Sequence, residues 1–568
     1  MVSPNLFRKT EDAIPLEIND KGKKLFQIIY SEQTQSGVKE DHTPRIRVSA
    51  LISRLSFFYE KIRNAIDYDE EHLLRKNAIH RILRRQMIIE GAVLQTDARQ
   101  IAEHLLVELI RGSYLPNNEL PETKINEVEL KLAKYIKLKE ELSVKMSANW
   151  SLDGDINEAK ETIQKKNSLT SWLITLAACE IEEHLAPDRV KQTIVDNLYS
   201  ILSKKIELPI DLPYEADKEI QIYLSIGRKY LKFDEDMLSF ILFKYYNAGW
   251  VDITDSSESI IKISDSLDNL RQVIGTQLNH PLTRQLDRIV RRYSLYFYIF
   301  SETIAIDPTK VYADFQKSEK NLVSAVSKVC NQKYARSKRR LWRAAIRSII
   351  YIFLTKSVFV FLIEVPAIRL FNEPLNPVSL AINVAFPAVL LFIIVFLTRK
   401  PGEDNTKMII DGIKEITLET SKESSPIVLR QPPSRTWTKD WVFKLIYGVG
   451  FLISMYFIIK GLTYINFNWV SITIFLFFLA FVSFFSVRIT KGLKELTVVE
   501  RRENIFTLLL DLFYMPIIMA GRWLSGKFSK INVFIFLFDF VIEAPFKVLV
   551  EVAEEWTKYI RERRENIE

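Results

Sequence analysis

Cysteine is scarce in this chain, which holds only Cys179 and Cys330 among its 568 residues. Two cysteines cannot build a disulfide framework or a four-cysteine metal site, and they suit a reducing compartment. Sixteen glycines leave few places for loops that cradle phosphate, and the six histidines are scattered. We find no enzyme signature, and we predict no metal or other cofactor.

The first thirty residues also lack an apolar stretch of signal-peptide length. Four acidic residues argue against an organellar transit peptide; they are Glu11, Asp12, Glu17 and Asp20. We therefore expect the N-terminus to stay in the cytoplasm.

Hydrophobicity divides the chain into two unlike parts. A strongly charged part of about 345 residues precedes a part with apolar runs long enough to cross a bilayer. This division excludes a purely soluble, disordered or collagen-like protein. The formal net charge of +8 is modest for this length, so bulk charge does not indicate nucleic acid as a partner.

The first part is predicted to be helical, because apolar residues recur at three- and four-residue steps and sustained alternation is absent. An amphipathic helix is expected over 45–66. Segments rich in Pro, Asn, Asp or Gly predict breaks at 111–123, 149–157 and 207–217. We interpret 1–44 as an N-terminal extension, 45–205 as one helical subdomain and 215–335 as a second.

Within the second subdomain, two apolar stripes flank His280 and Pro281. They run from Ile260 to Leu278 and from Leu282 to Phe300 and predict an antiparallel helical hairpin packed within the chain. A homotypic coiled-coil seam between two copies stays open as an alternative.

The segment from Ile101 to Glu122 resembles the opening helix and turn of GntR-type winged-helix repressors, in which a helix ending in Gly leads to a Leu-Pro pair. That resemblance implies DNA binding. However, residues 124–142 lack the Ser-Arg-x-Thr-Val type of recognition helix, and no wing is evident. Nucleic acid is therefore an unlikely partner.

Four apolar runs qualify as membrane spans, at 346–366, 378–398, 442–463 and 466–487. They predict two transmembrane hairpins, 346–398 and 442–487, separated by a connector at 399–441. Lysine and arginine gather before the first span, in the connector and after the fourth span. These clusters all lie on the side that basic residues favour if the N-terminal part, the connector and the region after the fourth span are cytoplasmic. The fold class is thus all-α, with a cytoplasmic helical domain followed by a multi-pass membrane domain.

The C-terminal region, 488–568, is predicted to lie along the cytoplasmic face as amphipathic helices. Charged residues recur every four positions in its apolar run, which draws one polar stripe along a helix; they are Asp539, Glu543, Lys547, Glu551 and Glu555. Two further spans would show the same spacing and stay open as an alternative.

Lys356 is the best single candidate for a functional residue, because an ammonium group in the middle of a span costs about 2.5–3.5 kcal/mol unless it is paired or hydrated. Glu364 is eight residues away and not directly opposite on a helix, so a partner from another helix, Asp539 or Glu543, is favoured. The functional interpretation is an ion or solute path or a coupling charge; the alternative is a buried structural pair or a snorkelling lysine.

Two other patterns carry less weight. Residues 521–527 match most of a P-loop, but Phe528 replaces the hydroxyl residue that would hold magnesium. Glu180 and His184 are four apart and would be only half of a metal site.

The sequence thus predicts a multi-pass inner-membrane protein that acts as a membrane-tethered scaffold, regulator or assembly factor. Its expected partners are the lipid bilayer and either another protein or a second copy of the chain. The alternative is a small ion or solute transporter or channel that uses Lys356 and the C-terminal carboxylates.

Overall fold

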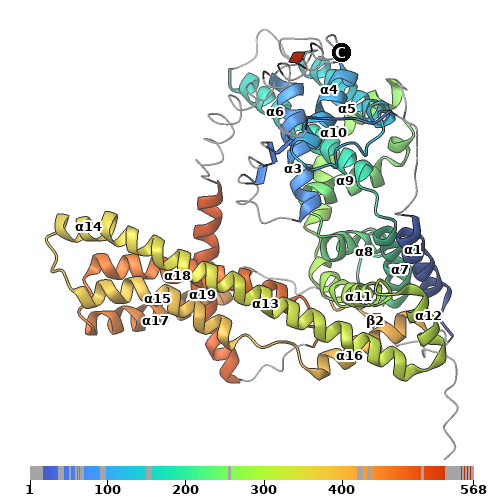
Figure 1. Ribbon diagram of the computed structural model, residues 1–568. Helices are drawn as coiled ribbons and strands as arrows, with labels where there is room; N and C mark the ends of the chain where they lie inside the picture. The colour runs from blue at the N-terminus through green and yellow to red at the C-terminus, as the bar shows by residue number, and fades with distance from the viewer. Residues whose placement is uncertain are drawn as a thin grey trace, which may run out of the picture. The chain divides into compact units, whose positions relative to one another are not determined.

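A computed structural model describes residues 17–35, 44–49, 70–89, 97–148, 156–253, 257–418, 426–431, 437–499 and 505–530, with isolated positions at 53–63 and beyond 551. The chain separates into two compact units. Unit 1 comprises 1–31, 295–425 and 431–532, and unit 2 comprises 32–294, 426–430 and 533–568. We describe each unit by itself (Figure 1).

Unit 2 is built almost wholly of helices. Its elements are α3 (Glu71–Arg84), η1 (Arg85–Ile89), α4 (Ala98–Arg111), α5 (Thr123–Ala148), α6 (Ile156–Leu185), α7 (Arg189–Lys205), β1 (Ile206–Glu207), α8 (Lys218–Ile226), η3 (Gly227–Leu231), α9 (Glu235–Tyr246), η4 (Ala248–Val251) and α10 (Ser257–Leu278). Two of the three predicted breaks fall between α4 and α5 and between β1 and α8. The third, 149–157, lies almost wholly outside the described residues.

Helix α6 lies at the centre of the core of unit 2. The helices α3, α5 and α9 all pack against it, and its apolar face, including Leu173, Ala177 and Ile181, is buried. Aspartate caps fix where several helices begin: the Asp188 carboxylate accepts from the Lys191 N–H, and the Asp234 carboxylate accepts from the Met237 N–H.

Two short extended segments differ from the helical prediction. Residues 45–49 are not helical: Arg45 forms an antiparallel bridge with Pro121, while Ile46 and Val48 are buried. The helix expected over 45–66 is therefore wrong at its start, and most of its remainder lies outside the described residues. In addition, β1 pairs in parallel with β2 (Ile427–Val428), a ladder too short for its sequence to signal.

The two stripes around His280 and Pro281 form separate helices, α10 and α11 (Thr283–Ile304). Helix α10 packs against α5 and α9. The boundary between the two units falls within α11, after Ser294.

Unit 1 contains the long apolar helices. It includes α1 (Asp20–Gln35), the end of α11, α12 (Pro308–Lys317), α13 (Glu319–Phe359), η5 (Val360–Glu364), α14 (Val365–Leu370), α15 (Pro377–Leu397), α16 (Glu403–Thr417), α17 (Trp437–Tyr464), α18 (Trp469–Lys494) and α19 (Ile505–Lys530). Among the described residues, four helical stretches are long and apolar enough to cross a membrane: Glu319–Leu370, Pro377–Leu397, Lys444–Tyr464 and Trp469–Lys494. These stretches contain the four predicted spans, except for a few terminal residues.

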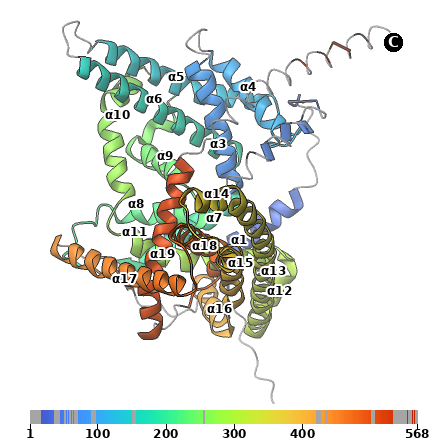
Figure 2. The same ribbon diagram turned by 90° about the vertical axis from the view of Figure 1, so that its left-hand side faces the viewer.

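Helices α13, α15 and α18 form the centre of the apolar bundle, since each packs against the other two (Figures 1 and 2). Helix α19 packs against α18 and α17. The contact with α18 is very close, because a Cβ atom added to Gly521 would lie 2.0 Å from the Ala480 carbonyl oxygen. Unlike the bundle interior, the outward faces expose large apolar residues such as Leu354 and Phe361.

Hydrogen bonds gather four separate segments at one end of this bundle. The Asn405 side chain, on α16, contacts Tyr334 of α13 at 2.8 Å and donates to the Leu496 carbonyl oxygen at 2.9 Å. Its own oxygen accepts from the Val498 N–H at 2.7 Å. Helix α1 joins them, because the Asn19 N–H donates to the Thr417 carbonyl oxygen at 2.8 Å.

The short loops at the other ends of the apolar helices also meet. Asn376 donates to the Asn466 carbonyl oxygen at 3.2 Å, and Asn468 donates to the Pro374 carbonyl oxygen at 3.2 Å. The rings of Phe371 and Trp469 stack edge to face 4.8 Å apart.

A candidate charge site within the apolar bundle

Lys356 and Glu364 are both completely buried inside the bundle. Their Nζ and Oε2 atoms lie 4.0 Å apart. The neighbouring residues Leu354, Val358 and Phe361 are more than half exposed, so this helix turns its apolar face outward and its charged residues inward. That orientation is typical of ionisable residues in spans.

A wide turn of the helix brings these two residues together. In a regular α-helix, residues eight positions apart are turned about 80° from one another. Between Lys356 and Glu364 lies η5, where the Val365 N–H donates to the carbonyl oxygen five residues back, at Val360. The additional residue in this turn rotates Glu364 towards the face of Lys356, and Pro366, which lacks an N–H, follows directly.

The sequence-based preference for a partner from another helix therefore needs correction. Among the described residues, the carboxylate that faces Lys356 is Glu364, on the same helical stretch. Asp539 and Glu543, the other candidates, lie outside the described residues.

Two polar residues from other helices complete the cluster. The Asn383 side chain on α15 donates to Glu364 Oε1 at 2.5 Å, and the Ser471 hydroxyl on α18 donates to the same oxygen at 2.8 Å. Asn383 also contacts the Ser471 carbonyl oxygen at 3.2 Å. All four side chains of this Lys356–Glu364–Asn383–Ser471 cluster are shielded from solvent.

Hydrogen bonding within the cluster is incomplete. Lys356 Nζ, Glu364 Oε2 and Asn383 Oδ1 are buried and have no hydrogen-bond partner among the described residues. The ammonium group instead lies over the Phe478 ring, 3.7 Å from its centroid, a cation–π contact worth about 2 kcal/mol when it is desolvated. The cluster can neutralise the Lys356 charge and connect α13, α15 and α18. The groups without a partner among the described residues, one donor and two acceptors, are suited to hydrogen bonding with a small polar species.

Sequence reasoning missed Asn383 and Ser471. Both lie in runs without any charge, and an uncharged polar residue in a span carries a weaker signal than a lysine does. The available signal was the position of Asn383 within the predicted second span, because amides and hydroxyls in spans commonly bond across helices.

Unit 2 uses its buried charges differently. Glu180 of α6 accepts from the Tyr135 hydroxyl and the Trp250 indole N–H, both at 2.8 Å, and pairs with Lys131 and Lys134 at 3.1 and 3.3 Å. Burial raises the pKa of Glu180, but Lys134, the Trp250 hydrogen bond and Lys131 outweigh burial and leave the pKa below its ordinary value.

The other sequence patterns fall on ordinary helices. His184 contacts Glu127 at 2.7 Å, so the Glu180–His184 pair does not converge on a metal; the described residues contain no cluster of three potential ligands. Residues 521–527, the P-loop-like stretch, lie inside α19. After the GntR-like segment comes α5, a 26-residue helix whose Lys134 and Tyr135 point into the core.

Comparisons with known proteins add no relative: no protein-family model, curated protein or solved structure matches this chain.

Proposed function

We propose that this chain is a multi-pass inner-membrane protein with a cytoplasmic helical domain, and that it acts as a membrane-tethered scaffold, regulator or assembly factor. Its spans form two hairpins. The observation that carries this topology is the Asn405 centre, where segments before span one, after span two and after span four meet. The loops after spans one and three meet elsewhere.

Charge supports the assignment of the Asn405 end to the cytoplasm. Arg336, Arg340, Arg343 and Arg347 are exposed on α13 at steps of four, three and four residues, which places them on one helix face just before the span. Arg399, Lys400, Arg488 and Lys491 follow spans two and four. Basic residues flanking spans favour the cytoplasmic side.

The points at which the chain passes between the two units favour the cytoplasmic side of the membrane for unit 2 as well. The chain leaves unit 1 within α1, after Ser31, and returns within α11, at Leu295. Helix α1 is bonded to the end of α16, so both crossings belong to the cytoplasmic end of the bundle. The described residues of 32–294 contain no helix long and apolar enough to span a membrane.

Helix α19 packs among the candidate spans, because Leu512 lies against Gly450 of α17 and Gly521 lies against Ala480 of α18, and we propose that its C-terminal end stays on the cytoplasmic side. In both views it runs across the direction of α13, α15 and α18 (Figures 1 and 2). Arg522 and Lys527 would stay inside the cell in this arrangement, in agreement with the basic bias. The segment 531–550, including its polar stripe, lies outside the described residues.

Paired cysteine substitutions test the topology. Tyr464→Cys, at the 90% exposed last residue of α17, should react with an impermeant thiol reagent in intact cells. Glu403→Cys and Ser525→Cys should react only after permeabilisation. The native thiols serve as a silent background, since both are buried and burial raises their pKa values. Labelling of Glu403→Cys from outside would reverse the orientation, and labelling of Ser525→Cys would make α19 part of a transmembrane hairpin.

The scaffolding role is supported by what unit 2 does with its polar residues. Its buried charges, such as Glu180 and Lys76, are occupied by ion pairs within the fold. Its surface offers an aromatic anchor of the kind enriched in protein interfaces, because Tyr245 at the end of α9 is 54% exposed and Val251 is 60% exposed.

Purification in a mild detergent tests this role. A stoichiometric protein partner should co-purify with the wild type and be lost from the double variant Tyr245→Ser, Val251→Ser. Ile210→Ser is the matched control, because Ile210 is another exposed apolar residue of the same unit. Equal partner recovery from all variants would remove this surface from the proposal, and purification without any partner would contradict scaffolding.

Transport of a small ion or solute is the second candidate, favoured by the unpaired atoms of the Lys356–Glu364–Asn383–Ser471 cluster. The complete burial of all four residues weighs against an open path. Flux into liposomes that disappears in Lys356→Met at unchanged protein abundance would establish transport, and flux equal to that of empty liposomes would exclude it for the ions tested.

A further inference from the structure

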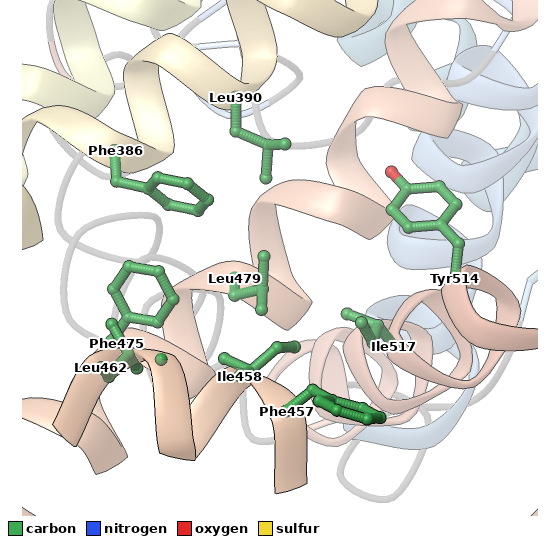
Figure 3. A pocket seen from close by; sticks show the side chains of 10 residues that line it. Phe386, Leu390, Phe457, Ile458, Leu462, Phe475, Leu479, Tyr514 and Ile517 are labelled. Carbon is green, nitrogen blue, oxygen red and sulfur yellow. The ribbon is translucent and has the colours of Figure 1, made fainter. Parts of the chain in front are cut away.

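A pocket of about 370 Å³ lies between four helices of unit 1 (Figure 3). Phe386 and Leu390 come from α15, Phe475 and Leu479 from α18, and Ile517 from α19; the remaining lining residues are Phe457, Ile458, Gly461, Leu462 and Tyr514. Three of the four helices are candidate spans. The pocket is therefore built inside the apolar part of the molecule, by residues from distant parts of the chain.

The lining excludes most classes of ligand. Every lining side chain is apolar or aromatic, and the tyrosine hydroxyl is the one polar side-chain group that the pocket offers. Water is poorly held in such a site, whereas an apolar cavity of about 150 Å³ already binds a benzene-sized molecule. A pocket of this size suits a longer apolar molecule.

Tyr514 gives the pocket one polar contact point. Its hydroxyl oxygen is buried and has no hydrogen-bond partner in the part of the chain that the structure describes. In Figure 3 the hydroxyl end of the ring is directed towards Leu390, on the opposite wall. A buried hydroxyl without a partner destabilises the fold. A ligand atom that accepts its hydrogen bond would remove this cost and so increase the affinity of the ligand.

The surroundings indicate where the ligand comes from. Phe457 lines the pocket and is 66% exposed, and the neighbouring α17 residues Leu452 and Tyr456 are also more than half exposed on the apolar helix. An opening at this face leads into the hydrocarbon layer, where lipid acyl chains are the most abundant molecules. Their ester carbonyl oxygens are hydrogen-bond acceptors.

We propose that this α15–α17–α18–α19 pocket binds one acyl chain of a membrane phospholipid, with its ester carbonyl oxygen accepting a hydrogen bond from Tyr514. The lipid would connect α17 and α19 to the three-helix centre of the bundle. This inference requires only that the apolar helices are embedded in a bilayer, and it holds for either orientation of the chain.

Photo-crosslinking tests the proposal on the full-length protein. The chain is reconstituted into nanodiscs of phosphatidylethanolamine and phosphatidylglycerol that contain a phospholipid with a diazirine in its acyl chain, and crosslinked peptides are mapped by mass spectrometry. Label should concentrate on peptides that contain 457–462 and 514–517. Peptides that contain 350–354, on the exposed face of α13, report insertion into the bilayer independently of the pocket.

Two glycines provide matched variants. A Cβ atom added at Gly461 or at Gly448, both on α17, meets no atom within 4 Å, but only Gly461 lines the pocket. Gly461→Leu should reduce pocket label to the level of the α13 face, and Gly448→Leu should leave it unchanged. Tyr514→Phe, which keeps the ring, should weaken labelling about fivefold through loss of one hydrogen bond.

Several results would overturn the proposal. Pocket label equal to that on 350–354 in the wild type would make this surface ordinary lipid-facing protein. Equal label in Gly461→Leu and Gly448→Leu would place the chain outside the pocket. Mass spectrometry of the intact protein that finds a bound isoprenoid quinone in place of a phospholipid would assign the site to another class of ligand.

Discussion

Glu180 and Glu364 are both buried carboxylates with lysine neighbours, but their surroundings differ. Glu180 has four partners from α5 and η4, so both of its oxygens are bonded. Within the described residues, Glu364 has two donors on one oxygen, and its other oxygen has no hydrogen bond. A fold surrounded by water can bring many polar side chains to one buried charge, whereas an apolar bundle has few to bring.

The difference extends to the two units as wholes. Unit 2 closes its apolar faces on one another around α6, while unit 1 leaves large apolar side chains exposed along α13, α15 and α17. The first pattern is typical of a fold in water, and the second is typical of helices in lipid. Each of the following predictions tests this difference between the two units.

The largest effect is expected from dividing the chain. A fragment of residues 44–294 should be soluble and helical, because its core lies within unit 2. A fragment of residues 1–335 should aggregate, since it retains Tyr296 but loses α16, whose Gly412 packs on the Tyr296 ring. Size-exclusion chromatography and circular dichroism measure both. A soluble, monomeric 1–335 fragment together with an aggregated 44–294 fragment would reverse the assignment of the boundary.

Glu180→Ala should have the next largest effect. It leaves two lysines, a hydroxyl and an indole N–H without their shared acceptor, and removal of one partner from a buried charge network costs about 3–5 kcal/mol. Thermal unfolding of the detergent-purified chain, followed by limited proteolysis of unit 2, measures the loss. Glu103→Ala, at an exposed position of α4, is the control and should change stability by less than about 0.5 kcal/mol. Similar melting of both variants would show that the Glu180 network is unimportant.

Glu364→Gln should destabilise the chain less than Glu180→Ala does. The amide keeps a bond acceptor for Asn383 and Ser471 but leaves the Lys356 charge without its counter-charge, at a cost of about 2 kcal/mol. Lys356→Met alone should cost a similar amount, because it leaves the Glu364 carboxylate without its counter-charge, and the double variant should lose less stability than the sum of the two single variants. Thermal unfolding in nanodiscs measures this double-mutant cycle. Additive effects of the two substitutions would show that the pair does not interact.

Acidification should have the smallest effect, and it should act on unit 2. Burial lowers the pKa values of His72 and His80 in the folded state. The unfolded chain therefore binds more protons, and stability is lost as the pH falls below about 6.5, by less than about 1.4 kcal/mol per pH unit for each histidine. Melting temperatures from pH 8 to pH 5 measure the slope. His72→Gln, His80→Gln should flatten it, and an unchanged slope would assign the acid sensitivity to other groups.

The sequence predicted the helical class, four apolar helices long enough to span a membrane, and the breaks between α4 and α5 and between β1 and α8, because these depend on local signals: hydrophobic periodicity, run length and turn-forming residues. It failed where distant residues decide. Residues 45–49 are extended because they pair with the loop after α4, and Leu25 and Phe26 of the presumed N-terminal extension are buried in unit 1.

The candidate site shows the same limit. Lys356 was recognisable because a charge within an apolar run is conspicuous. Its pairing with Glu364 depends on the wide turn of η5, for which Pro366 was the one available signal. The contributions of Asn383 and Ser471 depend on how α15 and α18 are rotated against α13, and helix rotation is set by the packing of whole faces.

The continuity of α13 has a mechanical consequence. This helix runs for 41 residues without a break, from Glu319 to Phe359, and spans about 60 Å at 1.5 Å per residue. Tyr334, held by Asn405, and Lys356, held beside Glu364, are thus two points on one stiff rod, about 33 Å apart. A rotation of α13 about its axis at Tyr334 is therefore transmitted to Lys356. The contacts of Tyr334 and those of Lys356 should change together.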